Sequence, residues 1–186
     1  MIKLVLTDLD NTLVAHGPNS VFGKDKVSRR ALKAIRAFID TGAHFGPVTG
    51  RSSSSMANVF RDKSWAYATG AFANGQLIRM DGEVIHREWT PQGPLQRVVD
   101  ILDQQHDGIL VLFDMEGTRP TWGVSRRHRD WPETVKGGIR IETIACEVEG
   151  PTLKASIRLR EAEHTPALRD LLSREVDELE IGRAHV

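Results

Sequence analysis

Two carboxylates lie two positions apart near the start of the chain. Asp8 and Asp10 follow the apolar run at residues 2–6, which only Lys3 interrupts. A short, partly β-branched run of this kind predicts a strand buried on both faces of a parallel sheet. Alternate side chains of extended backbone share a face, so both acids can point into the crevice where open α/β sheets bind ligands. A paired acid site there is costly unless a cation or a reaction uses it, although a bare Asp-x-Asp also occurs in solvated turns and helix caps.

A threonine occupies the equivalent place after a second predicted strand. The apolar residues 43–48 end in Thr49-Gly50-Arg51, and a serine run then opens another helix. Backbone N–H groups at a helix N-terminus bind anions readily. Beside the acidic pair, Thr49 and its neighbours therefore predict a phosphate site, while plain helix capping is the alternative.

Both motifs resemble those of a known superfamily. Residues 8–13 (Asp-Leu-Asp-Asn-Thr-Leu) resemble the D-x-D-x-T-L/V signature of the haloacid dehalogenase (HAD) superfamily, most of whose members are Mg-dependent phosphohydrolases. Residues 49–51 are similar to its second motif in the form of the Cof-type (class IIB) branch. The Asn74-Gly75 pair is also similar to Cof-type proteins, although a type I′ turn explains Asn74 equally well.

The resemblance implies a reaction and a cofactor. Asp8 would be the nucleophile that forms an aspartyl-phosphate, and Asp10 would protonate the leaving alcohol and then deprotonate the attacking water. Mg²⁺ would be held by the Asp8 carboxylate and the Asp10 carbonyl, because a cation must neutralise the repulsion between the phosphate and its nucleophile. Thr49 and Gly50 would hold the phosphoryl oxygens.

Strands and a helix must position these residues. Apolar side chains recur at helical spacing between Ser28, a predicted N-cap, and Gly42, a predicted stop. Strand, helix and strand in this order predict a parallel sheet. Pro47 removes a ladder donor from the second strand, which suggests an edge position or a local bulge.

Further along, the pairing is predicted to become antiparallel. Residues 65–69 are expected to form a third strand. Asn-Gly and Asp-Gly pairs are strong hairpin signals, so residues 76–80 and 83–86 should pair antiparallel. We therefore expect a core domain at residues 1–82 and a second domain at residues 83–186.

The second domain mixes helices with antiparallel strands. Apolar patterns predict one helix around residues 95–102 and another that Thr165 caps, with Pro166 at its first position. The expected strands are 109–113, 121–124, 139–144, 153–159 and 178–181. This order predicts an α+β layer with helices on one face, and it is similar to the C2-type cap of Cof-like proteins. The expected fold is thus α/β: a Rossmann-like HAD core, with an incomplete parallel sheet, and an α+β cap.

Four residues are further candidates for substrate contact. Lys154 and Arg158 alternate with apolar residues in the strand at 153–159, which gives the sheet a polar, cationic face. The resemblance adds Arg51 and Asn74.

HAD phosphatases also use a lysine of a third motif and acids of a fourth. The sequence contains no G-D-x-x-x-D run, and it ends at Val186, about where the core should resume. Lys154 could replace the missing lysine or be an ordinary residue of the sheet face. We expect either a truncated chain or a partner that supplies the missing strands and acids. Open strand edges would then favour self-association.

Composition limits the classes of binding partner and the cellular location that we expect. The chain has 186 residues, with 25 basic and 25 acidic side chains, and zero net charge gives no support for binding nucleic acid or an anionic membrane. One cysteine, Cys146, excludes an internal disulfide, and we expect it to be buried. No run of 18 apolar residues and no signal peptide is evident, so a cytoplasmic location is expected.

The leading hypothesis is a Mg-dependent phosphatase acting on a small phosphorylated metabolite, with a sugar phosphate as the expected substrate. The alternative is a catalytically impaired or truncated HAD-like module that binds phosphoryl groups or another subunit. A phosphomutase of the same superfamily is a third reading.

Overall fold

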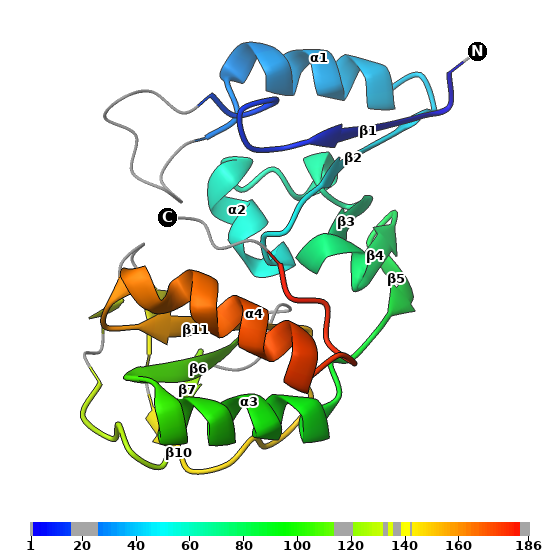
Figure 1. Ribbon diagram of the computed structural model, residues 1–186. Helices are drawn as coiled ribbons and strands as arrows, with labels where there is room; N and C mark the ends of the chain where they lie inside the picture. The colour runs from blue at the N-terminus through cyan, green and yellow to red at the C-terminus, as the bar shows by residue number, and fades with distance from the viewer. Residues whose placement is uncertain are drawn as a thin grey trace. The chain divides into compact units, whose positions relative to one another are not determined.

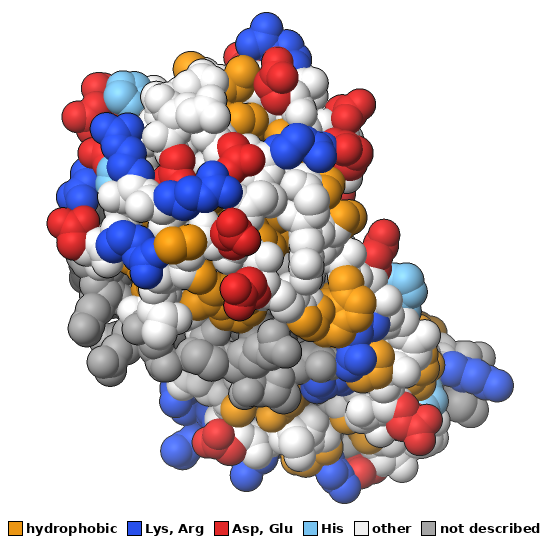
Figure 2. Space-filling view, turned by 90° about the horizontal axis from the view of Figure 1, so that it is seen from below, with side chains coloured by type: hydrophobic (Ala, Val, Ile, Leu, Met, Phe, Trp, Pro, Cys, Tyr) orange, Lys and Arg blue, Asp and Glu red, His pale blue; other side chains and the backbone are white. Residues whose placement is uncertain are grey.

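The computed structural model describes residues 2–15, 26–113, 121–131, 134–135, 139–141 and 143–182. Contacts divide these residues into two units, the first ending at Glu88 and the second beginning at Trp89 (Figure 1). Each unit has a sheet of its own, and the expected α/β class is confirmed. Figure 2 shows acidic and basic side chains intermingled on the face that it presents, in keeping with the zero net charge.

The first unit is built on a five-stranded sheet with the order β1-β2-β3-β4-β5. Its strands are β1 (Leu4–Asp8), β2 (His44–Val48), β3 (Gly70–Phe72), β4 (Leu77–Met80) and β5 (Glu83–Arg87). The pairs β1–β2 and β2–β3 are parallel, and the pairs β3–β4 and β4–β5 are antiparallel. The predicted change from parallel to antiparallel pairing is therefore confirmed. Because β5 pairs with β4, the first unit extends beyond residue 82, where we expected the core to end.

Helix α1 (Arg29–Ile39) forms where its apolar spacing predicts it. The Ser28 hydroxyl caps it by accepting a 3.0 Å hydrogen bond from the Ala31 N–H. Gly42, at φ 81°, follows the end of the helix in a conformation that glycine adopts without strain. The remaining helical segments of the unit are short: η1 (Ser53–Ser55), α2 (Met56–Val59), η2 (Ser64–Ala66) and η3 (Ala73–Gly75).

Two expectations for the first unit are wrong. Within the described residues β1 pairs only with β2, so it is an edge strand, and Leu4 and Leu6 are 42% and 50% exposed rather than buried. The third strand is β3, whereas residues 65–69 lie in η2 and the bends after it. The pattern of apolar residues alone did not show where the chain becomes close enough to β2 for pairing.

Pro47 lies in the interior of the sheet and not at an edge. Strand β2 runs between β1 and β3, and Pro47 stays in register with Thr7 without a bulge. The β2–β3 ladder consists of the single register pair Val48 and Ala71. Just before that pair the two backbones approach closely, because a Cβ added to Gly46 would lie 2.2 Å from the Thr69 carbonyl oxygen. Residue 46 must therefore be a glycine for the two backbones to approach this closely.

The second unit is an antiparallel-rich sheet covered by two helices on one face. The sheet order is β10-β7-β6-β11, and a separate pair is formed by β8 and β9. The elements are α3 (Gln92–Gln105), β6 (Gly108–Phe113), β7 (Trp122–Val124), β8 (Thr134–Val135), β9 (Ile139–Arg140), β10 (Thr143–Ala145), β11 (Lys154–Leu159), η4 (Ala162–His164) and α4 (Thr165–Glu175). Leucines of α3 and α4 share one core with the inner faces of β6, β7 and β11, which confirms the predicted layer.

Three details of the second unit differ from expectation. The predicted strand at 178–181 is absent, because these residues form a turn and an extended segment whose Leu179 and Ile181 pack against the core without strand pairing. The N-cap of α4 is His164 rather than Thr165. Cys146 is exposed and lies against Arg129. Among the described helices, none combines the length and the apolar character that a bilayer crossing requires.

Candidate active site

Asp8 is the last residue of β1, and its side chain is exposed. The Thr12 hydroxyl donates a 3.1 Å hydrogen bond to its Oδ2 atom. Between the two predicted acids, Leu9 is fully buried, and its carbonyl accepts a 2.8 Å hydrogen bond from the Val14 N–H. This buried leucine anchors the tight turn that presents Asp8 and Asp10 on either side of it.

Asp10 is bound by Arg51, 41 positions further along the chain. The Arg51 Nε–H donates to Oδ2 of Asp10 at 3.0 Å, and an Nη2–H donates to Oδ1, so the pair is bidentate. The Arg51 side chain is 9% exposed and that of Asp10 is 32% exposed, which makes this contact stronger than an ordinary surface ion pair. The bridge ties the loop after β1 to the loop after β2.

Thr49 is buried in the second of these loops and is held from several sides. Its N–H donates to the Ala71 carbonyl at 2.9 Å, and its own carbonyl accepts from the Asn74 N–H at 3.1 Å. Its hydroxyl oxygen accepts a 3.1 Å hydrogen bond from the Arg51 N–H. A hydroxyl that accepts in this way keeps its proton for donation, which is what a phosphoryl oxygen requires.

Helix capping was the alternative explanation of the motif at residues 49–51. The residue that caps the following helical segment is Ser52 and not Thr49. The Ser52 hydroxyl accepts a hydrogen bond from the Ser55 N–H and caps η1. The following α2 has only four residues, so its dipole adds little at Thr49. The anion-binding capacity predicted here therefore depends on Thr49 and its neighbours, and not on a long helix.

The structure brings together part of the predicted set. Asp8 ends β1, and the two loops that the bridge joins in the first unit contain Asp10, Thr49, Gly50 and Arg51. Asn74, at φ 60°, is an exposed turn residue tied to this group through its backbone. Lys154 and Arg158 belong to β11 of the second unit. The Asp10–Arg51 bridge was not foreseen, since Arg51 was expected to contact substrate.

Oxygen ligands at this site fit a magnesium ion. Mg²⁺ is commonly bound through one or two carboxylates together with water and substrate phosphate, and Asp8 with the Asp10 carbonyl could supply such a set. Among the described residues, no third acidic, histidine or cysteine side chain joins these two at ligand distance. The residues therefore suit a weak site that a phosphate completes.

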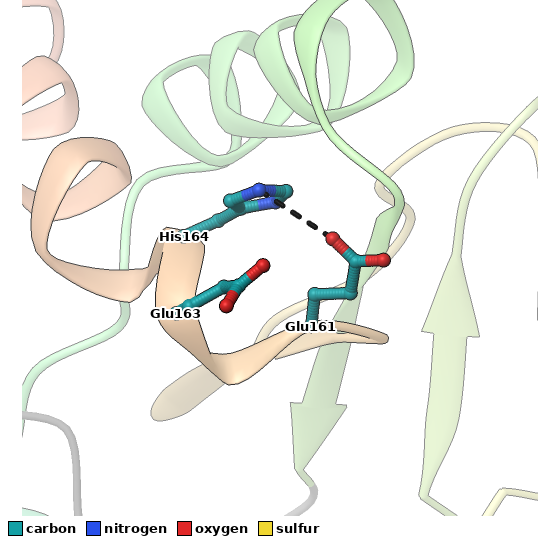
Figure 3. Close-up of side chains that lie close together, drawn as sticks. All are labelled: Glu161, Glu163 and His164. Atoms are coloured by element: carbon teal, nitrogen blue, oxygen red, sulfur yellow. Dashed lines mark ion pairs between the residues drawn. The ribbon is translucent and has the colours of Figure 1, made fainter.

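The described chain has one other group of metal-type ligands, in the second unit. Glu161, Glu163 and His164 place their ligand atoms within 4.8 Å of one another, with His164 Nε2 3.5 Å from a Glu161 carboxylate oxygen (Figure 3). All three are exposed, and acids in such positions are common without an ion. We assign this group no metal.

Removing the guanidinium from the bridge should weaken the first unit. Arg51→Gln leaves the partly buried Asp10 carboxylate without its charged partner, and we expect a loss of about 2 kcal/mol in the free energy of unfolding. Urea denaturation measures it. The second substitution Asp10→Asn in the same chain should restore part of the loss, because no unpaired charge then remains.

The control is Arg36→Gln. Arg36 pairs with Asp40 at 2.9 Å, but both side chains are more than half exposed, so the expected loss is below about 0.5 kcal/mol. Equal losses for the two variants would contradict a structural role for the Asp10–Arg51 bridge.

Comparisons with known proteins support the resemblance. A family model described as haloacid dehalogenase-like hydrolase matches residues 5–129, more than half of the chain. No curated protein matches the sequence.

Solved structures share the fold at low sequence identity. A hypothetical protein from Geobacillus kaustophilus HTA426 aligns with a TM-score of 0.70 at 17% identity, over 100% of this chain and 66% of that one. The phosphatase BT1666 from Bacteroides thetaiotaomicron aligns at 0.67 and 21%, over 100% and 64%. The subclass IIB sugar phosphatase BT4131 aligns at 0.65 and 13%, over 98% and 66%.

The chain thus spans 64% to 66% of the length of these three proteins. At such identities the likeness establishes the fold, and the family follows from the model that covers both motif loops. The chain belongs to the haloacid dehalogenase-like hydrolase family.

Proposed function

We propose that the chain carries the nucleophile and the phosphate-binding loop of a Mg-dependent phosphatase of the Cof-type branch, which hydrolyses a small phosphorylated metabolite. The observation that carries this proposal is the exposed Asp8 carboxylate at the end of β1, next to a turn that Arg51 fastens to the Thr49 loop. A sugar phosphate is the proposed substrate, because one structural neighbour is described as a sugar phosphatase.

Each residue would have a distinct task. The free oxygen of Asp8 attacks phosphorus, while Thr12 fixes the other oxygen and so the orientation of the carboxylate. The Thr49 hydroxyl and the Gly50 N–H donate to phosphoryl oxygens. Bound Mg²⁺ would neutralise the charge that the phosphate and Asp8 bring together.

Asp10 would carry the proton, and its present contacts set a condition on that role. It accepts two hydrogen bonds from the Arg51 guanidinium, as an ionised carboxylate does. To give a proton to the leaving alcohol, Asp10 must first be released from at least one of these donors. We propose that the phosphoryl group, a competing anion, draws Arg51 away.

The test is turnover of p-nitrophenyl phosphate by the purified chain with Mg²⁺ and with EDTA. Magnesium-dependent release of p-nitrophenol supports the proposal. Absence of turnover together with Mg²⁺-dependent binding of inorganic phosphate at the Thr49 loop, seen by NMR, would favour the second function below.

The second candidate is a phosphoryl-binding or subunit-interaction module, and two observations favour it. Among the described residues no third acid joins Asp8 and Asp10, and β1 leaves one edge without a partner strand. Exposed apolar edges promote association between chains. A cytoplasmic location remains part of the proposal in either case.

If chains associate through β1, a charged side chain on this strand should weaken the association. Leu6→Lys places a cation on this half-exposed edge strand, and we expect it to shift sedimentation velocity profiles from larger species toward the monomer. Ile85→Lys, at an exposed position of β5 on the opposite edge, is the control. If Ile85→Lys gives the monomer and Leu6→Lys does not, association uses β5 instead.

A further inference from the structure

A groove of about 510 Å³ lies in the first unit, between α1 and the segment that follows α2 (Figure 1). Leu32 of α1, which is 8% exposed, and the half-buried Trp65 of η2 give the groove an apolar lining. The other residues that line it are all cations: Arg29, Lys33, Arg36, Arg61 and Lys63. A volume of this size is typical of sites for small molecules.

Backbone contacts hold the second wall of the groove against the start of α1. The Val27 N–H donates a 2.9 Å hydrogen bond to the Val59 carbonyl, and the Arg61 Nε–H donates to the Val27 carbonyl at 3.0 Å. Arg61 and Asp62 then turn the chain toward η2 with φ angles of 55° and 60°, which residues other than glycine rarely adopt. Such strained backbone is often found beside ligand sites.

Helix α1 has an unusual charge for its place in the fold. It carries four basic side chains and no acidic one, and its first turn begins with Arg29 and Arg30. The helix dipole favours acids in the first turn and disfavours cations there. These two arginines therefore do not serve the stability of the helix, and Arg29 also lines the groove.

Most of the cations in the groove are not neutralised by the chain itself. Arg36 pairs with Asp40 at 2.9 Å, and Arg61 contacts a neutral carbonyl. Within the part of the chain that the structure describes, the side chains of Arg29, Lys33 and Lys63 have neither an ion pair nor a hydrogen bond. Like charges on opposite walls repel each other, and an anion between them would remove this cost.

The apolar part of the groove suits a flat ring. The Arg36 guanidinium already lies over the Trp65 ring, with 5.3 Å from its Cζ to the ring centroid. Indole rings and guanidinium planes both stack on the flat rings of organic molecules, including nucleobases. The groove thus combines a stacking surface with a rim of positive charge.

We propose that this groove binds an organic anion that carries a flat ring, the chemistry of a nucleoside diphosphate. The ring would lie against Trp65 and Leu32, and the anionic groups would accept hydrogen bonds from Arg29 and Lys33 on α1 and from Lys63 on the other wall. None of the lining residues belongs to the motif loops that contain Asp8 and Thr49. The proposal therefore does not depend on phosphatase activity.

The indole N–H resonance of Trp65 tests the proposal by NMR. The chain has four tryptophans, and the variant Trp65→Phe identifies this resonance by its loss. ADP is titrated at constant ionic strength with EDTA, so that no Mg²⁺-dependent hydrolysis occurs. We expect the Trp65 resonance to shift and saturate, whereas pyrophosphate, which lacks the ring, and adenosine, which lacks the charge, should each bind about tenfold or more weakly.

Arg29→Gln and Arg30→Gln form a matched pair of variants. Both remove one charge from an exposed position in the first turn of α1, but only Arg29 lines the groove. Arg29→Gln should weaken ADP binding about fivefold or more, because a charge-assisted contact is lost, and Arg30→Gln should leave it unchanged.

Four results would overturn the proposal. Equal weakening in both variants, or shifts that rise without saturation, would show only general attraction to anions. Pyrophosphate or adenosine binding as tightly as ADP would show that the groove does not read both halves of the ligand. Shifts confined to the Thr49 loop would place ADP at the phosphatase site. A glutamate-rich peptide that binds more tightly than ADP would identify a surface for acidic protein segments instead.

Stability provides an independent check on Arg29. Without ligand, Arg29→Glu should unfold at a higher temperature than the wild type, because an acid in the first turn of α1 interacts favourably with the helix dipole. The same variant should bind ADP more weakly than Arg29→Gln does. A clearly lower unfolding temperature would mean that Arg29 supports the fold, and it would overturn its assignment to a ligand.

Discussion

Asp8→Asn is expected to abolish phosphoryl transfer while leaving the fold intact. An asparagine amide has nearly the same shape as the carboxylate but cannot form an acyl phosphate, so turnover should fall by at least about a thousandfold. The side chain is exposed and accepts one hydrogen bond, from Thr12, so the free energy of unfolding should change by less than about 0.5 kcal/mol. Turnover of p-nitrophenyl phosphate and thermal unfolding measure the two effects.

Asp40→Asn is the control for the loss of one carboxylate. Asp40 follows α1 and pairs with Arg36 at the surface, so its replacement should leave turnover unchanged. An Asp8→Asn protein with wild-type turnover would show that another group attacks phosphorus. The assignment of the nucleophile, and with it the proposed phosphatase mechanism, would then be wrong.

Gly46→Ala should have the largest effect on stability. The added Cβ would lie 2.2 Å from the Thr69 carbonyl oxygen, and both atoms belong to or adjoin backbone that cannot rotate away. The backbones of β2 and of the segment before β3 would have to separate. We expect the first unit to lose more than about 3 kcal/mol, the range of severe overpacking, with urea denaturation as the measurement.

Gly42→Ala separates this clash from the general cost of losing a glycine. Gly42 has a positive φ of 81° but open space around it, so alanine should cost only about 1 kcal/mol. Similar unfolding midpoints for both variants would mean that β2 tolerates a side chain at residue 46. The close approach would then not be what holds β2 to β3.

Local patterns predicted most of the elements of the first unit. The spacing of apolar residues together with Ser28 placed α1, and the Asp-Gly pair at residues 81–82 has the two positive φ angles that a tight hairpin requires. The prediction that Pro47 lies at an edge of the sheet was wrong. Whether a missing N–H disturbs a sheet depends on the neighbouring strand that faces it, and the sequence of one strand does not show that neighbour. Here glycines allow a close approach that a one-strand pattern does not reveal.

The sequence predicted where the acids and the threonine of the candidate site lie along the strands, but not the side-chain contacts between the two loops. The positions of Asp8 and Thr49 at the ends of adjacent parallel strands follow from the βαβ order. The bridge between Asp10 and Arg51 depends on two loops meeting in space, which neither motif shows alone. The alternation along β11 correctly placed Arg158 on the face opposite the helices, yet only the structure shows that its buried Nε–H has no acceptor among the described residues.

The guanidinium bridge has a consequence for the timing of catalysis. While Arg51 donates to both oxygens of Asp10, this carboxylate, the proposed acid and base of the site, is not available to transfer a proton. An arriving phosphate ester would compete for the same positive fork, and its success would unlock the acid. In the proposed mechanism, Asp10 would therefore become available for proton transfer only when a phosphate ester is bound.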